Sequence, residues 1–280
     1  MTVSKLGAYF RTPKGMLVIA LLALAAIAYP VDGQAALLRL GLSAGTAIAF
    51  DLVLMRRRGK LELPDSALLT GLIVAMVMSQ TAPWYAPVLA SALAITSKHL
   101  IRAKSGHIFN PAAVGLLMTA LLLSSEQSWW GGLGDLPAPF IVLVIVAGGV
   151  IAERVNKLPS VLAFSATYFG LLTAASIMSS PLAVADAFRE PMSGAAMYFA
   201  FFMLSDPPTT PARGSDQVWF SMAVAVASLL CLALRSSAVY YLLVGLLAGN
   251  GIEAVRRSLM ARSKKARATR SPRLSPSPTT

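Results

Sequence analysis

The sequence predicts an all-α polytopic membrane protein, with ten transmembrane helices arranged as two inverted five-helix repeats. Its composition is the first indication, because 56% of the 280 residues are hydrophobic, only 13% are charged, and the mean hydropathy is +0.68. Soluble domains carry about 25% charged residues, so a soluble cytosolic enzyme and a disordered protein are both excluded. One cysteine and two histidines are too few for a disulfide framework or for a metal centre built from these ligands.

The apolar residues form long blocks, which are the second indication. A helix needs about 20 residues to cross the hydrocarbon, with shorter and longer spans known. By this measure we expect ten spans, with no cleavable signal before the first. The spans cover residues 15–30, 35–55, 65–79, 83–97, 109–124, 137–152, 159–179, 192–204, 218–234 and 238–255.

The distribution of basic residues is the third indication. The formal net charge is +12, from 24 Lys and Arg against 12 Asp and Glu. If the N-terminus is cytoplasmic, ten spans place every Lys and Arg except Arg39, Arg189 and Arg235 at the cytoplasmic ends. A miscounted span would invert every later loop and scramble this pattern. We therefore expect both termini in the cytoplasm and a multi-pass protein of the inner (plasma) membrane.

These segments define the expected organisation of the chain. Residues 1–14 are a cytoplasmic N-terminus, 15–136 a first five-helix repeat, and 137–255 a second one. Residues 256–280 are basic and end in a Ser- and Pro-rich run, which is typical of disorder. We interpret them as a disordered cytoplasmic tail that contacts anionic lipid rather than nucleic acid.

Two short spans occupy the third position of each predicted half, residues 65–79 and 192–204. The first contains Thr70 and Gly71, and the second begins with Ser193 and Gly194. In inverted repeats, short or interrupted helices at matching positions often build a site at mid-membrane. Small residues also serve ordinary helix packing, but the matched pair favours a site.

Ionisable residues at membrane depth are candidates for function because they are costly there. Asp51 lies one turn before Arg56, so an ion pair and a functional role are equally open. Glu253 precedes two arginines at helical spacing, which predicts local pairing. Asp206 ends the span 192–204 before two prolines, where it either starts a turn or binds a ligand or neighbouring loop. We expect both histidines, His99 and His107, at the membrane interface, with a proton relay as the less favoured alternative.

Three motifs occur in order along the predicted spans. One joins residues 98–100 (KHL) to 107–115 (HIFNPAAVG), which include Asn110 and Pro111. Another is 65–72 (DSALLTGL), and the last is 193–207 (SGAAMYFAFFMLSDP). Together they resemble a known family, the NqrB/RnfD membrane subunits of redox-driven ion pumps, and the resemblance covers roughly the second to the tenth helix. It implies two inverted five-helix halves similar to urea transporters, a flavin held in the membrane subunit, and complexes that couple electron transfer to Na⁺ or H⁺ movement.

The sequence departs from this family at the flavin attachment point. The family attaches FMN to the Thr of a Ser-Gly-Ala-Thr motif, whereas Ala196 follows Ser193-Gly194-Ala195 here, and residues 129–135 contain no threonine. Because alanine cannot form a phosphoester, any flavin, FMN or riboflavin, is expected to be noncovalent.

We therefore predict a membrane subunit of an electron transport system, which would be at most a non-autonomous part of an oxidoreductase (translocase). Without a nucleotide-binding domain or iron–sulfur cysteines it needs partner subunits in the bilayer. The rivals are a small-solute transporter or channel of urea-transporter-like fold, and a membrane scaffold for a redox or biosynthetic complex. No catalytic or metal-binding residue is predicted. The candidate cofactor-binding residues are Thr70, Gly71, Asn110, Pro111, Ser193, Gly194 and Asp206.

Overall fold

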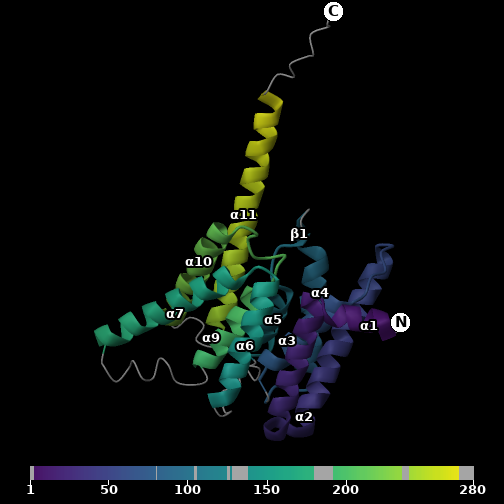
Figure 1. The fold of residues 1–280 in the computed structure, drawn as a ribbon. Coiled ribbons are helices and arrows are strands. Elements are labelled where there is room, and N and C mark those ends of the chain that lie inside the picture. The colour runs from purple at the N-terminus through teal and green to yellow at the C-terminus, as the bar shows by residue number, and fades with distance from the viewer. Residues whose placement is uncertain are drawn as a thin grey trace, which may run out of the picture.

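The computed structural model describes residues 3–79, 81–103, 106–124, 127, 138–179, 192–234 and 240–270. These residues are mostly helical (Figure 1). The helices are α1 (Val3–Phe10), α2 (Pro13–Arg57), α3 (Asp65–Val77), α4 (Tyr85–Leu100), α5 (Pro111–Leu123), α6 (Ala138–Arg154), α7 (Leu158–Ser179), α9 (Met192–Tyr198), the π-helix η2 (Phe199–Leu204), α10 (Gly214–Ala233) and α11 (Tyr241–Arg270). Between α4 and α5 two antiparallel strands of two residues each, β1 (Arg102–Ala103) and β2 (Gly106–His107), form a short hairpin.

Local sequence explains where several helices begin and break. Thr12 caps α2, since its hydroxyl accepts the Gly15 N–H at 3.2 Å, and Pro13 follows at the first helical position. Gly33, at φ +62°, interrupts α2 in a conformation that glycine adopts at no steric cost. The two predicted spans 15–30 and 35–55 are therefore the two arms of α2.

Each of the ten predicted segments overlaps a helix, and the prediction of a helical membrane protein is confirmed at that level. Within the described residues, three helical segments are long and apolar enough to cross a membrane, Gly33–Arg57, Leu158–Met178 and Gly214–Ala233. Others are shorter, such as α3 and α5 with 13 residues each. At 1.5 Å per residue these reach about 20 Å, less than the roughly 30 Å of hydrocarbon. The number of ten spans stays a prediction.

The outer surface of the helices is apolar, as a lipid-facing surface requires. Large hydrophobic side chains from several helices are more than half exposed, among them Leu121, Val142, Leu162, Trp219 and Leu230. On a soluble monomer, exposed apolar side chains are usually scattered singly, whereas here they occur on most of the long helices. The exposed apolar residues therefore support a bilayer as the surrounding solvent.

One predicted boundary differs from the structure. The segment 256–270, expected to be disordered, continues α11 as helix and projects beyond the other elements in Figure 1, where it is yellow. The reason lies in the side chains, since residues 252–270 contain neither Gly nor Pro and are rich in Ala, Arg and Lys. Residues 271–280, and the predicted domain boundary at 136/137, lie outside the described residues.

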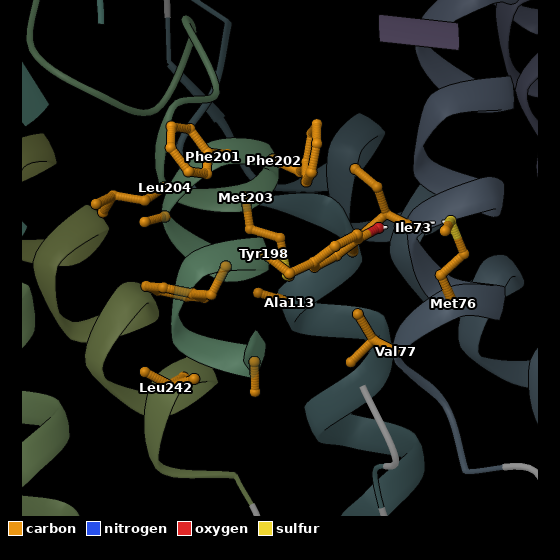
Figure 2. Packing of buried hydrophobic residues seen from close by; sticks show 14 of the residues in the cluster. Ile73, Met76, Val77, Ala113, Tyr198, Phe201, Phe202, Met203, Leu204 and Leu242 are labelled. Atoms are coloured by element: carbon orange, nitrogen blue, oxygen red, sulfur yellow. Dashed lines mark hydrogen bonds between the residues drawn. The ribbon is translucent and has the colours of Figure 1, made fainter. Parts of the chain in front are cut away.

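The core is centred on the segment formed by α9 and η2. Figure 2 shows Tyr198 pointing toward Ile73 and Met76 of α3, whereas Leu242 of α11 lies on the opposite side of the α9–η2 segment. The Tyr198 hydroxyl lies 3.7 Å from Sδ of Met76 in α3, so the two short segments that the sequence paired meet in the middle of the molecule. Phe201 packs on Gly148 of α6, where a Cβ would lie 2.4 Å from the ring.

Similar contacts recur in the two parts of the chain. In the first, the buried hydroxyls of Ser43 (α2) and Ser91 (α4) are 2.7 Å apart; in the second, Ser160 (α7) and Ser221 (α10) are hydrogen-bonded. Close helix packing recurs too, with Gly115 of α5 against α4, and Gly245 of α11 against α10. Each of these glycines is four residues after the first residue of its helix.

Candidate functional site

The C-terminal end of η2 meets α5 and the following loop at a polar junction. The last carbonyls of a helix lack partners within it, and here side chains supply them. Asn110 Nδ2 donates to the Met203 carbonyl at 3.1 Å, Thr210 Oγ1 to that of Leu204 at 2.5 Å, and the Ser205 hydroxyl to that of Phe201. This satisfies backbone groups that would be costly unpaired at membrane depth.

Asn110 organises the same junction from the other side. Its Oδ1 accepts the Ala113 N–H at 3.1 Å and caps α5, with Pro111 at the first helical position. Its own N–H donates to Oδ1 of Asn250 in α11 at 3.0 Å. The Nδ2 group of Asn250 is buried and has no partner among the described residues, so a hydrogen-bond donor at the junction remains unused.

Asp206 joins the hairpin to the loop after η2. Its Oδ2 lies 3.3 Å from Nε2 of His107 in β2 and accepts the Thr209 hydroxyl at 3.0 Å. The Asp206 carbonyl also accepts the N–H groups of Thr209 and Thr210, so this residue starts a turn and contacts the neighbouring hairpin, while a role in ligand binding stays a prediction. The side chains of Asp206 and His107 remain partly exposed, so they border the junction rather than its buried centre.

Two cations hold the loop 206–213 through its backbone. Lys157 Nζ donates to the carbonyls of Thr210 and Pro211 at 3.2 and 2.6 Å, and Arg257 donates to those of Pro208 and Thr210 at 3.0 and 3.1 Å. Burial, and then the nearby Arg257 charge, lower the pKa of Lys157 below its ordinary value. Arg257 is in turn oriented by Glu253.

The local pairing expected for Glu253 is confirmed. Its carboxylate is buried and lies 2.7 Å from Nε of Arg256 and 2.7 Å from Nε of Arg257, which are three and four residues later in α11. Arg256 also contacts Asp216 of α10 at 3.0 Å. This network ties the last helix to the loop that carries Asp206.

The predicted site residues fall into three groups. Asn110, Pro111 and Asp206 belong to the polar junction described above. Thr70 and Gly71 lie in α3. The Thr70 hydroxyl donates to the Ser66 carbonyl. A Cβ added to Gly71 would lie 2.6 Å from the backbone of α2, so the two helices pack closely at this glycine. Ser193 and Gly194 begin α9, at the opposite end of the 192–204 segment from Asp206. Whether all seven bind one ligand stays a prediction.

A second polar cluster was not predicted as a unit. Asp51 of α2 is only 2% exposed and pairs with Lys98 and His99 of α4, rather than with Arg56. His99 is 5% exposed and therefore packs among the helices, while its expected position at the membrane interface stays a prediction. The sequence signal for this cluster was the adjacent pair Lys98 and His99, because both side chains reach the Asp51 carboxylate from α4.

Comparison with known proteins agrees with the motifs in the first part of the chain. Residues 10–137, a little under half of the chain, match the NQR2, RnfD, RnfE family, so this part of the chain is similar to that family and the resemblance is confirmed there. The match ends before α6, so the predicted extension of the resemblance to the tenth helix is not covered by it.

Three relatives are each named as the D subunit of an ion-translocating oxidoreductase complex. The protein of Tolumonas auensis is 34% identical over 103 residues, which are 35% of this chain and 30% of that protein. The Salmonella newport protein is 32% identical over 127 residues, 43% of this chain and 36% of the relative. The Rhodobacter capsulatus protein is 38% identical over 66 residues, 23% of this chain and 18% of the relative. The matched part thus spans about a third or less of these relatives.

Proposed function

We propose that this chain, whose residues 10–137 match the NQR2, RnfD, RnfE family, is an integral membrane subunit of an RnfD/NqrB-like electron transport system that couples electron transfer to cation movement. The family match carries the proposal, and the relatives named as D subunits of ion-translocating complexes support it. Electrons would reach this protein from partner subunits, because its sequence contains no dinucleotide-binding motif and a single cysteine.

The proposed architecture is two inverted five-helix halves. The recurring serine pairs and the two glycines four residues into α5 and α11 support equivalent packing in the halves. The meeting of α3 with α9 and η2 supports a shared centre. In such folds, short central segments leave their ends beside polar groups within the membrane.

A noncovalent flavin fits the polar junction in its donor chemistry. Flavin rings present carbonyl and ring-nitrogen acceptors, and the unused Nδ2 of Asn250 is a buried donor between Asn110 and α11. Thr70 and Gly71 fit less well, since their polar atoms and surfaces are engaged in helix packing. When bound, a flavin supplies the capacity to accept and pass on electrons.

The residues of this chain would contribute binding and order around such a cofactor. Asn250 would donate to an acceptor on the ring, and Asn110 would keep Asn250 oriented through its backbone N–H. Asp206, held by His107 and Thr209, would fix the loop that closes the junction. Lys157 and Arg257 place positive charge beside that loop, which favours an anionic cofactor form or phosphate.

The test is the visible absorption of the protein purified in mild detergent, before and after acid precipitation. Flavin released into the supernatant supports the proposal, whereas flavin in the pellet shows covalent attachment. Folded protein without flavin would instead favour the transporter or scaffold. Asn250→Leu should lose flavin while the exposed Glu62→Gln control retains it; equal flavin content in both would contradict the assignment to the junction.

Membrane orientation can be tested separately with the single cysteine. In a Cys231→Ser background, Thr81→Cys should react with a membrane-impermeant maleimide on intact cells, because it follows the third span on the outer side. Glu62→Cys, in the exposed turn before α3, should react only after permeabilisation. The reverse pattern would contradict cytoplasmic termini.

A further inference from the structure

The buried cluster around Asp51 contains an arrangement that the proposed function does not use. Asp51 lies near the end of α2, where α3 and α4 pack on it, and its Oδ1 atom receives two groups. Lys98 Nζ is 3.0 Å away and His99 Nε2 is 2.6 Å away. Lys98 also donates to the Ser66 hydroxyl of α3 at 2.7 Å, so one cluster joins three helices.

Asp51 and Lys98 cancel each other when the imidazole is neutral. Arg58 of α2, which donates to the His99 carbonyl, adds one positive charge at the edge of the cluster. On α3, Asp65 is already paired with Lys14 at 3.1 Å. A proton on His99 would therefore add one positive charge, held by the short contact with the Asp51 carboxylate.

The second ring nitrogen of His99 is the feature that points to a ligand. Nε2 is engaged with Asp51, whereas Nδ1 is buried and has no hydrogen-bond partner among the described residues. In the neutral ring that donates from Nε2, Nδ1 carries a lone pair. An unused buried acceptor is costly, but it is a ready base when a proton can reach it.

We propose that His99 is a reversible proton-binding site, with Asp51 stabilising the protonated ring and Lys98 opposing it. Resting on the proposed function, this identifies H⁺ as the cation that the first half of the chain handles. In the binding step an O–H bond of hydronium breaks, its proton forms the Nδ1–H bond with the nitrogen lone pair, and a water molecule is left; no oxidation state changes. Release reverses the step. Lys98 is partly exposed and His99 lies one residue before the exposed end of α4, so a proton has only a short distance to travel between solvent and the cluster.

The experiment is nitrogen NMR of the full-length protein labelled with ¹⁵N-histidine in detergent micelles. The chain has two histidines, so His107→Gln leaves only the Nδ1 and Nε2 ring signals of His99, and His99→Gln identifies them by their loss. Between about pH 5 and 8, the range in which histidines change charge, Nδ1 of His99 should change from a bare nitrogen to an N–H. A His99 that keeps one protonation state over this range in folded protein would overturn the proposal.

Two variants give opposite signs, which separates the proposed electrostatics from general damage. Asp51→Asn, nearly isosteric, should lower the ratio of protonated to neutral His99 about tenfold at a fixed pH, and Lys98→Gln should raise it about tenfold. Shifts in the same direction would contradict the assigned roles. Circular dichroism of both variants checks that the helices remain folded.

The outcome is independent of the flavin measurement. A His99 that titrates in a protein without flavin would retain the proton site and defeat the electron-transfer proposal. A flavin-containing protein whose His99 does not titrate would do the reverse.

Discussion

The two parts of the molecule, α2–α5 and α6–α11, share a packing scheme but differ in how they use charge. A buried serine pair joins α2 to α4 in the first part and α7 to α10 in the second. In each part a glycine lets the last helix, α5 or α11, pack closely on the helix before it. In the first part, Asp51 is neutralised by Lys98 and contacts His99 within the helices. In the second, Lys157 and Arg257 hold carbonyls of a loop. Similar helical frameworks can therefore carry different polar chemistry.

The short central segments differ as well. α3 is a regular α-helix, whereas α9 continues into the wider η2, whose final carbonyls need Asn110, Thr210 and Ser205. Such π-helical turns occur frequently at functional sites. The junction at the end of η2 is thus the more specialised of the two segments.

The largest effect should come from the glycines that set the helix spacing. A Cβ at Gly115 would lie 2.2 Å from the Ala90 carbonyl oxygen, and one at Gly245 would lie 2.0 Å from the Ser228 hydroxyl, a side chain that can rotate. Gly115→Ala should therefore lower stability by about 3 kcal/mol and Gly245→Ala by less. Thermal unfolding in detergent measures both.

The matched control is Gly170→Ala, where nothing lies within 4 Å of the new Cβ. Removing a helical glycine there should be neutral or stabilising by about 0.5–1 kcal/mol. An equal loss of stability in all three variants would contradict the prediction that Gly115 and Gly245 are needed for close helix packing.

The cations of the second part should come next. Lys157→Met and Arg257→Met each remove charged hydrogen bonds to the loop and should cost about 2–3 kcal/mol. Because both side chains donate to the Thr210 carbonyl, the double variant should lose less than the sum. Additive losses in the double-mutant cycle would argue against a shared hold on the loop; the exposed Arg102→Met serves as control.

The serine pairs should give smaller, unequal effects. The Ser43 hydroxyl donates to the Gly71 carbonyl at 2.8 Å and accepts from Ser91, so Ser43→Ala removes two bonds at a three-helix contact. We expect a loss of about 2 kcal/mol, against about 1 kcal/mol for Ser160→Ala, which has one such bond. Ser258→Ala, on the exposed part of α11, should change the melting temperature little; if Ser160→Ala costs more than Ser43→Ala, the ranking is wrong.

The smallest effect is the pH dependence due to Lys157. Its pKa is lowered in the folded protein, so folding favours the neutral amine. Stability should therefore rise as pH increases through the folded pKa, and the gain should be complete above the ordinary value of 10.5. Melting temperatures across this alkaline window should rise more steeply in the natural protein than in Lys157→Met. Identical slopes would contradict the prediction.

Local features were predicted better than contacts between helices. Hydropathy located the helices, and helical spacing identified the pairing of Glu253 with Arg256 and Arg257, because those partners lie on one turn. Asp51 was different, since its partners are 47 and 48 residues away and only the packing of α4 on α2 selects them over Arg56.

Composition also misplaced the end of the last helix. The basic character of residues 256–270 suggested disorder, although the absence of helix breakers was the better guide. At the candidate site, Asn110 and Asp206 were identified from their positions at helix ends. Asn250, Lys157 and His107 became part of the junction only through tertiary contacts, which spacing along the sequence does not contain.

Because α11 continues to Arg270, the basic segment 256–270 has a fixed length. A flexible segment would let its cations settle on the nearest lipid, whereas 256–270 as a helix extends about 22 Å at 1.5 Å per residue. A rod of this length fixes how far from the bundle its basic end stands, and each added helical turn would lengthen it by about 5.4 Å while nearly preserving the direction of its side chains. The last helix therefore determines the distance between the basic residues and the helix bundle, in addition to supplying their charge.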